Sequence, residues 1–257
     1  MASGTIKRLL AAVVAIGVLV PALAWAGPPF FTDDPVPVDT GHWEVYGFSN
    51  RIDAEDDTNG ILAGVEVNYG VAPDTQLHVI VPLAFDAPPG GGLNVGAGDV
   101  ELGVKYRLFN PERGPRSARN WPQIAIFPLI EVPTGKASAD LGAGYVRAFL
   151  PLWLEKDFGD WTTYGGGGYW INPGPGNCNY WFAGWLLQKR LTKRLSLGGE
   201  LFYQTHDETD GRDGGGFNVG VTYDFTEHYH LLLSAGRGLI NPHANQFSYY
   251  IGLQHTF

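Results

Sequence analysis

The sequence has one cysteine, few charged residues, and no long apolar run after its first 26 positions. Cys178 has no partner within the chain, so a scaffold of intrachain disulfides is excluded. No phosphate-binding glycine loop, HExxH zinc motif or GxSxG nucleophile motif occurs, and we therefore expect neither a cofactor nor a metal site. The net charge of -9 and the scattered positions of lysine and arginine argue against nucleic acid as a partner.

Residues 1–26 have the organisation of a secretory signal peptide. Two basic residues precede the apolar stretch 9–20, Pro21 ends it, and residues 24–26 form an A-x-A cleavage site. We therefore expect export, with a mature chain that begins at Gly27. No later stretch approaches the roughly 18 consecutive apolar residues that a transmembrane helix needs.

Beyond the signal peptide, apolar residues recur at every second position. Between positions 61 and 71 the odd residues are apolar, whereas the even ones are mostly small or polar. This alternation is typical of a β-strand with one apolar and one polar face. It predicts twelve strands, near 41–51, 60–71, 75–85, 98–109, 121–132, 144–154, 161–171, 180–190, 195–206, 215–225, 229–237 and 246–257.

A soluble β-sandwich and an outer-membrane β-barrel both produce such alternation. The even strand number, the alternation of short turns with longer loops, and the aromatic residues near strand ends favour the barrel. The connection 110–120 is an exception, because it is long where a short turn is expected. The sequence therefore predicts an all-β fold: a transmembrane antiparallel up-and-down β-barrel of about twelve strands over residues 41–257, located in the bacterial outer membrane and surrounded by its lipid.

The last predicted strand ends on Phe257. A terminal phenylalanine that closes an alternating strand resembles the assembly signal of bacterial outer-membrane proteins. The resemblance implies that the barrel-assembly machinery is a partner of this chain.

Three stretches resemble a known family. They are PFFTDDP followed by HWE within residues 29–44, GDVELGVKYR at 98–107, and EVPTG at 131–135. In this order and spacing they resemble the outer-membrane transporter family named for the meta-pathway of phenol degradation. The resemblance implies a β-barrel that passes small aromatic or apolar molecules through the outer membrane.

The polar side chains, which occupy every second position of each strand, would face the lumen of such a barrel. Lys105, Arg107 and Arg147 can neutralise carboxylates on neighbouring strands. Two interpretations stay open: the charges are structural pairs that hold the barrel together, or they form a constriction that selects the solute by charge and size. The candidate residues of the solute path are Glu66, His78, Glu101, Lys105, Arg107, Glu131, Arg147, Glu200 and His206.

The strand at 144–154 has several aromatic residues on its inner parity. Tyr145, Phe149 and Trp153 would form a track that guides planar solutes by stacking. The next strand contains four consecutive glycines, 165–168, which leave room for a neighbour, a ligand or the N-terminal segment.

Residues 27–40 contain four prolines and suit neither a central strand nor a helix. They are a candidate plug of the lumen, with Asp33 and Asp34 as the candidate plug residues. The alternative is an ordered leader that simply enters the first strand.

A structural barrel, or a barrel enzyme that cleaves lipid or peptide, is the alternative to a channel. Such an enzyme needs an activated nucleophile or an Asp-His pair near the outer rim. The local candidates are His206 with Asp207 and Asp210, and the isolated His243. We expect a passive channel for a small, aromatic or apolar molecule rather than an enzyme.

Overall fold

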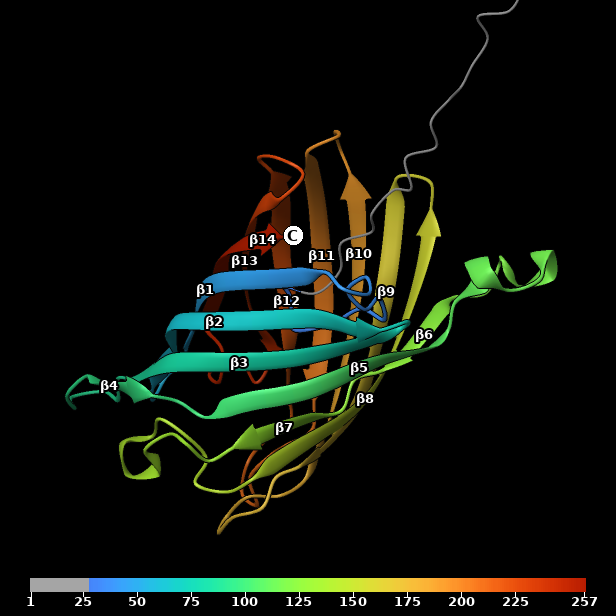
Figure 1. Ribbon diagram of the computed structural model, residues 1–257. Coiled ribbons are helices and arrows are strands. Elements are labelled where there is room, and N and C mark those ends of the chain that lie inside the picture. The colour runs from blue at the N-terminus through green and yellow to red at the C-terminus, as the bar shows by residue number, and fades with distance from the viewer. Residues whose placement is uncertain (1–27) are drawn as a thin grey trace, which may run out of the picture.

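The computed structural model describes residues 28–257, so the predicted signal peptide lies outside the described residues. Nearly all the regular structure is β-strand (Figure 1). The strands are β1 (Trp43–Asp53), β2 (Thr58–Ala72), β3 (Thr75–Asp86), β4 (Asn94–Ala97), β5 (Val100–Phe109), β6 (Gln123–Ile126), β7 (Leu129–Val132), β8 (Arg147–Phe158), β9 (Trp161–Ile171), β10 (Tyr180–Arg190), β11 (Leu195–Gln204), β12 (Gly214–Asp224), β13 (Tyr229–Ile240) and β14 (Phe247–Thr256).

The strands form a closed antiparallel barrel. Neighbours in sequence are neighbours in the sheet, and β1 pairs with β14 from Glu44 opposite Thr256 to Asp53 opposite Phe247. Strands β4 and β5 both pair with β3, and β6 and β7 both lie between β5 and β8, so each of these two pairs is one interrupted barrel strand. The predicted twelve-stranded up-and-down β-barrel is confirmed.

Both interruptions have a local cause. Pro128 separates β6 from β7, and since proline has no backbone N–H it cannot continue the ladder as a donor. Its carbonyl nevertheless accepts a hydrogen bond from the Val104 amide, which keeps the two segments on one path. Asp99 separates β4 from β5, where its carboxylate accepts hydrogen bonds from the Gly135 and Ala143 amides of the neighbouring loop.

Along the strands of the wall, buried and exposed side chains alternate, as the period of two predicts. On β8, Phe149, Pro151 and Trp153 are buried inside the barrel, whereas Leu150 and Leu152 are exposed on its outer face. The inner parity predicted for this strand is therefore found in the structure. Its bounds differ, because the strand begins at Arg147 rather than 144 and ends four residues later than predicted.

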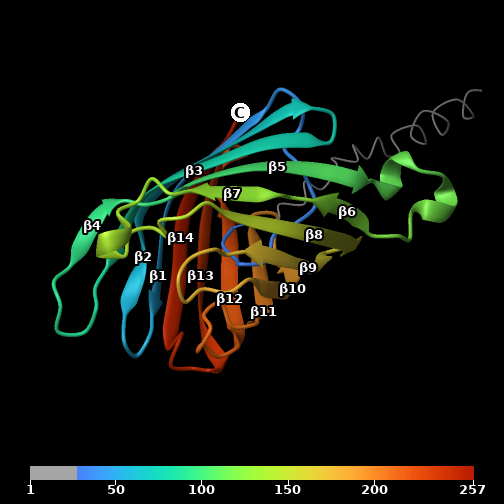
Figure 2. The ribbon, with the colours of Figure 1, turned by 90° about the horizontal axis from the view of Figure 1, so that it is seen from below.

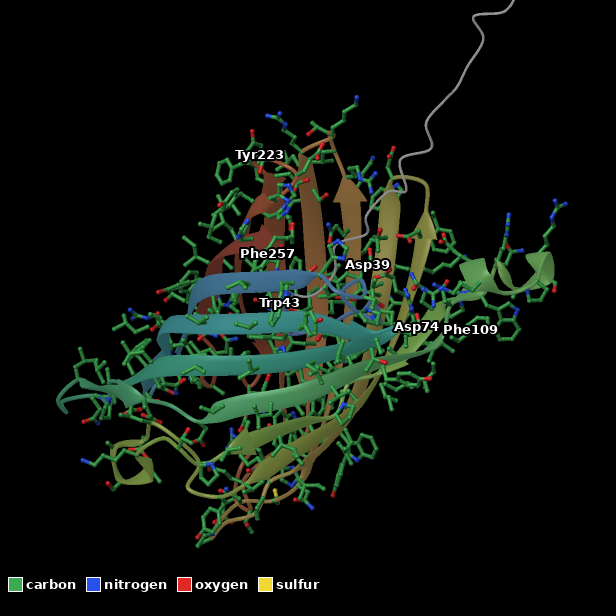
Figure 3. The ribbon with its side chains drawn as sticks, in the orientation of Figure 1. Asp39, Trp43, Asp74, Phe109, Tyr223 and Phe257 are labelled. Carbon is green, nitrogen blue, oxygen red and sulfur yellow. The ribbon has the colours of Figure 1, made fainter. Side chains whose placement is uncertain are left out.

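The connections differ in length at the two ends of the barrel. Trp43 and Phe257 exchange backbone hydrogen bonds, so the start and the end of the wall lie at the same end, near the short β2–β3 turn that contains Asp74 (Figure 3). The long connection 110–122 extends from this end and contains the 3-10 turns η1 (Pro111–Arg113) and η2 (Arg116–Ala118) (Figure 1). Within residues 28–257, no helix is long and apolar enough to cross a membrane.

Candidate functional site

Most of the predicted lumen residues lie on the inward face of the wall. Glu66, His78, Lys105 and Glu200 are buried, and the structure places Glu101, Arg107, Glu131 and Arg147 on the same face with partial exposure. His206 differs from the prediction. Strand β11 ends at Gln204, so the alternation stops before His206, whose half-exposed side chain lies in the following loop.

A chain of polar contacts joins β2, β3 and β5 inside the barrel. The Asn68 amide donates to Glu66 at 2.8 Å, and its oxygen lies 2.7 Å from His78 Nδ1. His78 Nε2 lies 2.9 Å from a carboxylate oxygen of Glu101. Because every member has a partner, this cluster stabilises the wall as a satisfied buried network.

The N-terminal segment, defined here as residues 28–42, runs inside the ring of strands (Figure 2). Glu200 on β11 accepts hydrogen bonds from the Phe31 and Thr32 amides and from the Thr32 hydroxyl. The Asn218 amide donates to the same carboxylate at 2.7 Å. One buried wall carboxylate thus holds two consecutive residues of the segment by charge-assisted hydrogen bonds.

Lys105 on β5 binds the same segment from another side of the wall. Its Nζ lies 3.0 Å from Asp33 Oδ1 and 3.6 Å from Asp34 Oδ2, and 4.9 Å from the ring centre of Phe127. The ion pairs of Lys105 are therefore made with the segment rather than with carboxylates of the neighbouring strands.

The other two predicted cations behave differently from Lys105. Arg107 pairs with Asp74 in the β2–β3 turn at 2.7 Å rather than with a neighbouring lumen carboxylate. Arg147 pairs with Glu131 at 3.4 Å across the adjacent strands β8 and β7, as the sequence predicts.

Missing side chains in the wall make room for the N-terminal segment. A Cβ placed on Gly184 would lie 1.9 Å from the Thr32 hydroxyl oxygen. The Phe30 ring likewise occupies the space where a Cβ on Gly198 or Gly220 would stand, at 2.9 and 2.8 Å. The predicted glycine run 165–168 has another role, because added Cβ atoms there would meet the neighbouring strands β8 and β10.

Asp34 is the most deeply enclosed carboxyl group of the segment. Its side chain is fully buried, and among residues 28–257 only Lys105 supplies a nearby positive charge. Burial raises the pKa of Asp34 well above its usual range, although Lys105 opposes the shift and Asp33 adds to it. Docking of the segment therefore shifts Asp34 toward protonation.

The half of the lumen that the N-terminal segment does not fill is hollow. Among the described residues, cavities of about 370, 470 and 640 Å³ lie there. The middle-sized cavity shares Phe31 and Ile52 with the smallest and Asn59 and Glu131 with the largest, so the three adjoin one another. Their linings include residues of the longer connecting loops, so this space lies toward the end of the barrel opposite Trp43.

We call the 370 Å³ cavity the aromatic pocket; Phe31, Phe149, Trp170, Phe182 and Phe202 line it. The rings of Phe149 and Trp170 stack at 4.8 Å, and Phe31 meets Phe202 edge to face at 4.9 Å. Trp170 is therefore a lumen residue, whereas the aromatic pattern at strand ends suggests an interfacial position on the outer face.

Arg147 closes one side of the Trp170 ring. Its guanidinium carbon lies 4.8 Å from the ring centre, and Nη2 donates to the Tyr180 hydroxyl at 3.0 Å. Of the predicted aromatic track, Phe149 and Trp153 are buried inside the barrel, while Tyr145 lies in the preceding loop and is exposed.

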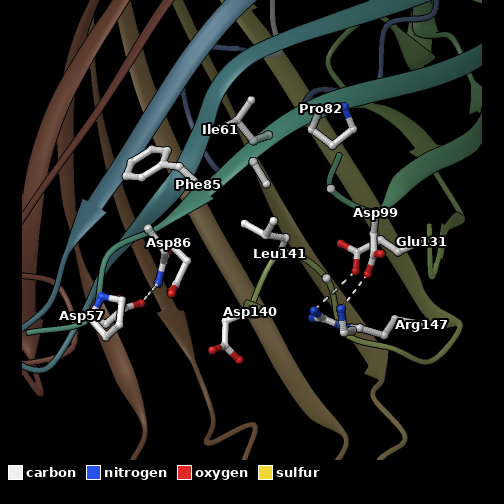
Figure 4. A pocket seen from close by; sticks show the side chains of 17 residues that line it. Asp57, Ile61, Pro82, Phe85, Asp86, Asp99, Glu131, Asp140, Leu141 and Arg147 are labelled. Atoms are coloured by element: carbon white, nitrogen blue, oxygen red, sulfur yellow. Dashed lines mark hydrogen bonds and ion pairs between the residues drawn. The ribbon is translucent and has the colours of Figure 1, made fainter. Parts of the chain in front are cut away.

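We call the 640 Å³ cavity the acidic vestibule, because five carboxylates and a single arginine line it (Figure 4). The arginine is Arg147, which faces Glu131. The four other carboxylates are those of Asp57, Asp86, Asp99 and Asp140. The candidates named from the sequence do not include these four, although acidic residues in and beside the loops at one end were the available signal.

The histidines that were candidates for catalysis each lie beside one carboxylate. His206 Nδ1 lies 2.9 Å from Asp213, rather than beside Asp207 or Asp210. Hydrogen bonds from Tyr203 and from His206 lower the pKa of Asp213 to about 2. His243 pairs with Glu55 at 2.6 Å. Within residues 28–257, no group of three or more His, Cys, Asp or Glu side chains is placed to hold a metal ion.

A family model described as "Putative MetA-pathway of phenol degradation" matches residues 51–251. The chain belongs to this family. The matched region covers most of the barrel wall but not the N-terminal segment. A comparison with curated proteins found no match.

Solved structures with the same fold are outer-membrane barrels. An outer-membrane channel from Pseudomonas putida F1 is similar with a TM-score of 0.73 and 14% identity, over 91% of this chain and 100% of that chain. The KdgM porin is similar with a TM-score of 0.58 and 13% identity, over 83% and 99%. The NanC porin is similar with a TM-score of 0.52 and 11% identity, over 83% and 98%.

Proposed function

We propose that this protein is an outer-membrane channel that passes a small aromatic or apolar molecule passively, and that its N-terminal segment gates the periplasmic exit. The short turns and the chain ends would then face the periplasm, and the loops of the vestibule the cell exterior. Export by the predicted signal peptide and insertion through the last strand, ending at Phe257, belong to the same proposal.

The aromatic pocket is the observation that carries this proposal. Its volume of about 370 Å³ lies in the range of small-molecule sites, and its walls are aromatic on several strands. Aromatic walls of this kind, to which Trp170 and Phe202 contribute, favour contact with a planar aromatic solute. The family and the channel and porin folds of the similar structures agree with transport.

The cavities would form a path for the solute along the barrel axis. A solute would enter the acidic vestibule, cross the adjoining cavity and reach the aromatic pocket, to which Phe31 contributes. Phe31 belongs to the N-terminal segment, so a solute in the pocket touches the gate itself. Release of the contacts at Glu200 and Lys105 would open the way to the periplasm.

Single-channel recording of the refolded mature protein in a planar bilayer tests the proposal. We expect discrete conductance steps that phenol interrupts more strongly than cyclohexanol, because only phenol is planar and can stack. Trp170→Leu is expected to weaken this block about tenfold. The matched control is Trp181→Leu, because Trp181 is exposed on the outer face and lies outside the pocket.

A folded wild-type barrel without conductance, or equal block in the two tryptophan variants, would contradict the proposal. The enzymatic alternative has its own readout. Cleavage of lipid or peptide by the silent barrel, abolished by His206→Ala, would assign the exposed His206–Asp213 pair a catalytic role instead.

A further inference from the structure

The acidic vestibule carries more negative charge than its neighbours balance. Glu131 faces Arg147 at 3.4 Å. Among the described residues, no lysine or arginine forms an ion pair with Asp57, Asp86, Asp99 or Asp140. The Asp99 carboxylate binds two backbone amides, which hold it in place without cancelling its charge.

The position of these charges matters as much as their number. They surround a cavity of about 640 Å³, and apolar side chains such as Ile61, Phe85 and Leu141 form the rest of its wall (Figure 4). Low-dielectric walls concentrate the field of the carboxylates into the space between them. The adjoining cavity is lined by Glu66 and Glu101, which both lie beside His78, and by Arg51, so the unbalanced carboxylates are those of the vestibule.

We infer that the acidic vestibule selects the solute by charge, admitting cations and uncharged molecules and repelling anions. Rings of acidic side chains have this effect in cation channels. Resting on the proposed function, this inference makes the solute of the aromatic pocket an organic cation or a neutral aromatic molecule rather than an aromatic carboxylate. An organic cation would also be attracted by the faces of the aromatic rings.

The sign of the local potential can be measured without any conductance. Ala84 lines the vestibule and accepts a cysteine with little change in volume. The experiment uses Ala84→Cys in a Cys178→Ser background. It compares the rates at which the new thiol reacts with two methanethiosulfonate reagents, one with a cationic trimethylammonium group and one with an anionic sulfonate group. The reference site is Gly92→Cys in an exposed loop, where an added Cβ meets nothing within 4 Å.

We expect the ratio of cationic to anionic rates to be about tenfold higher at residue 84 than at residue 92, and to fall as salt is added. Changing Asp57, Asp86 and Asp140 together to asparagine should bring the ratio at residue 84 close to the reference. The matched control removes three carboxylates from another outer loop, by Asp207→Asn, Glu208→Gln and Asp210→Asn, and should leave the ratio unchanged.

Equal ratios at the two sites, or equal effects of the two triple variants, would overturn the inference. Its failure is distinct from failure of the proposed function, which single-channel recording decides. Where steps occur, a salt gradient across the bilayer should show potassium to be about fivefold more permeant than chloride. A conducting channel that prefers chloride would keep the channel but overturn the charge selection.

Discussion

The two halves of the lumen share one wall but differ in what fills it. Toward the loops, the wall encloses adjoining cavities with aromatic and acidic linings. Toward the chain ends, the N-terminal segment occupies the lumen and binds Lys105 and Glu200. A β-barrel of this size does not by itself decide between a filled and an open interior. In this barrel the interior of one half is filled by a short segment that is not part of the sheet.

The polar groups of the two halves also differ in their partners. Lys105 and Glu200 are buried and are satisfied chiefly by the segment. The aspartates of the vestibule have no cation beside them among the described residues. The half that the segment fills thus holds it through buried partners, whereas the half with the cavities presents carboxylates that no ion pair balances.

The largest effect is expected from removal of the cation that binds the segment. Lys105→Met leaves Asp33 without its ion-pair partner and removes the positive charge beside Asp34, and removing one member of a buried ion pair costs about 3 kcal/mol. Docking of the segment should weaken by about a hundredfold. Hydrogen exchange of the peptide 28–40 measures this, with Lys136→Met in an exposed loop as the control. Equal protection in both variants would show that the ion pairs do not hold the segment.

A smaller effect is expected from adding a side chain at a glycine of the wall that contacts the N-terminal segment. Gly184→Ala places a Cβ against the Thr32 hydroxyl, and overpacking of this kind costs about 1–3 kcal/mol. The open fraction of the channel should rise several-fold in single-channel records. The control is Gly47→Ala, since an added Cβ there meets nothing within 4 Å. Identical records for the two alanine variants would place the segment elsewhere in the conducting state.

The smallest effect is expected from pH. The docked state raises the pKa of Asp34, so docking binds a proton and is favoured at acid pH. This contribution is lost as the pH rises through the docked pKa, and the open fraction should increase. Lys105, Asp33, Glu44, Glu155 and Tyr164 act electrostatically on Asp34 or respond to it. Asp34→Asn should remove this part of the dependence; an unchanged profile would assign it to another group.

The sequence predicted the wall well, because a period of two is a local property. The alternation at 61–71 and around Phe149 places side chains on the two faces of the wall without knowledge of the fold. The end of β11 before His206 was not predictable in this way, since the last residues of a strand depend on its neighbours.

The interior contacts could not be predicted for a different reason. Lys105 and Asp33 are far apart in sequence, and only closure of the barrel brings them to 3.0 Å. Thr32 fits against the wall because Gly184 has no side chain. The alternation predicts which residues face inward, but it does not predict which of them contact the segment. The sequence identified residues 27–40 as a candidate plug but gave no means of finding their binding partners.

Deleting residues 28–40 tests the central claim most directly. The single-channel conductance of the deletion variant is compared with that of the full mature chain in the same bilayer, after both are shown to fold. The account predicts small or intermittent steps for the full chain and steady steps at least about threefold larger for the variant, because the filled half becomes open. Equal conductance of the two proteins would contradict closure by the N-terminal segment.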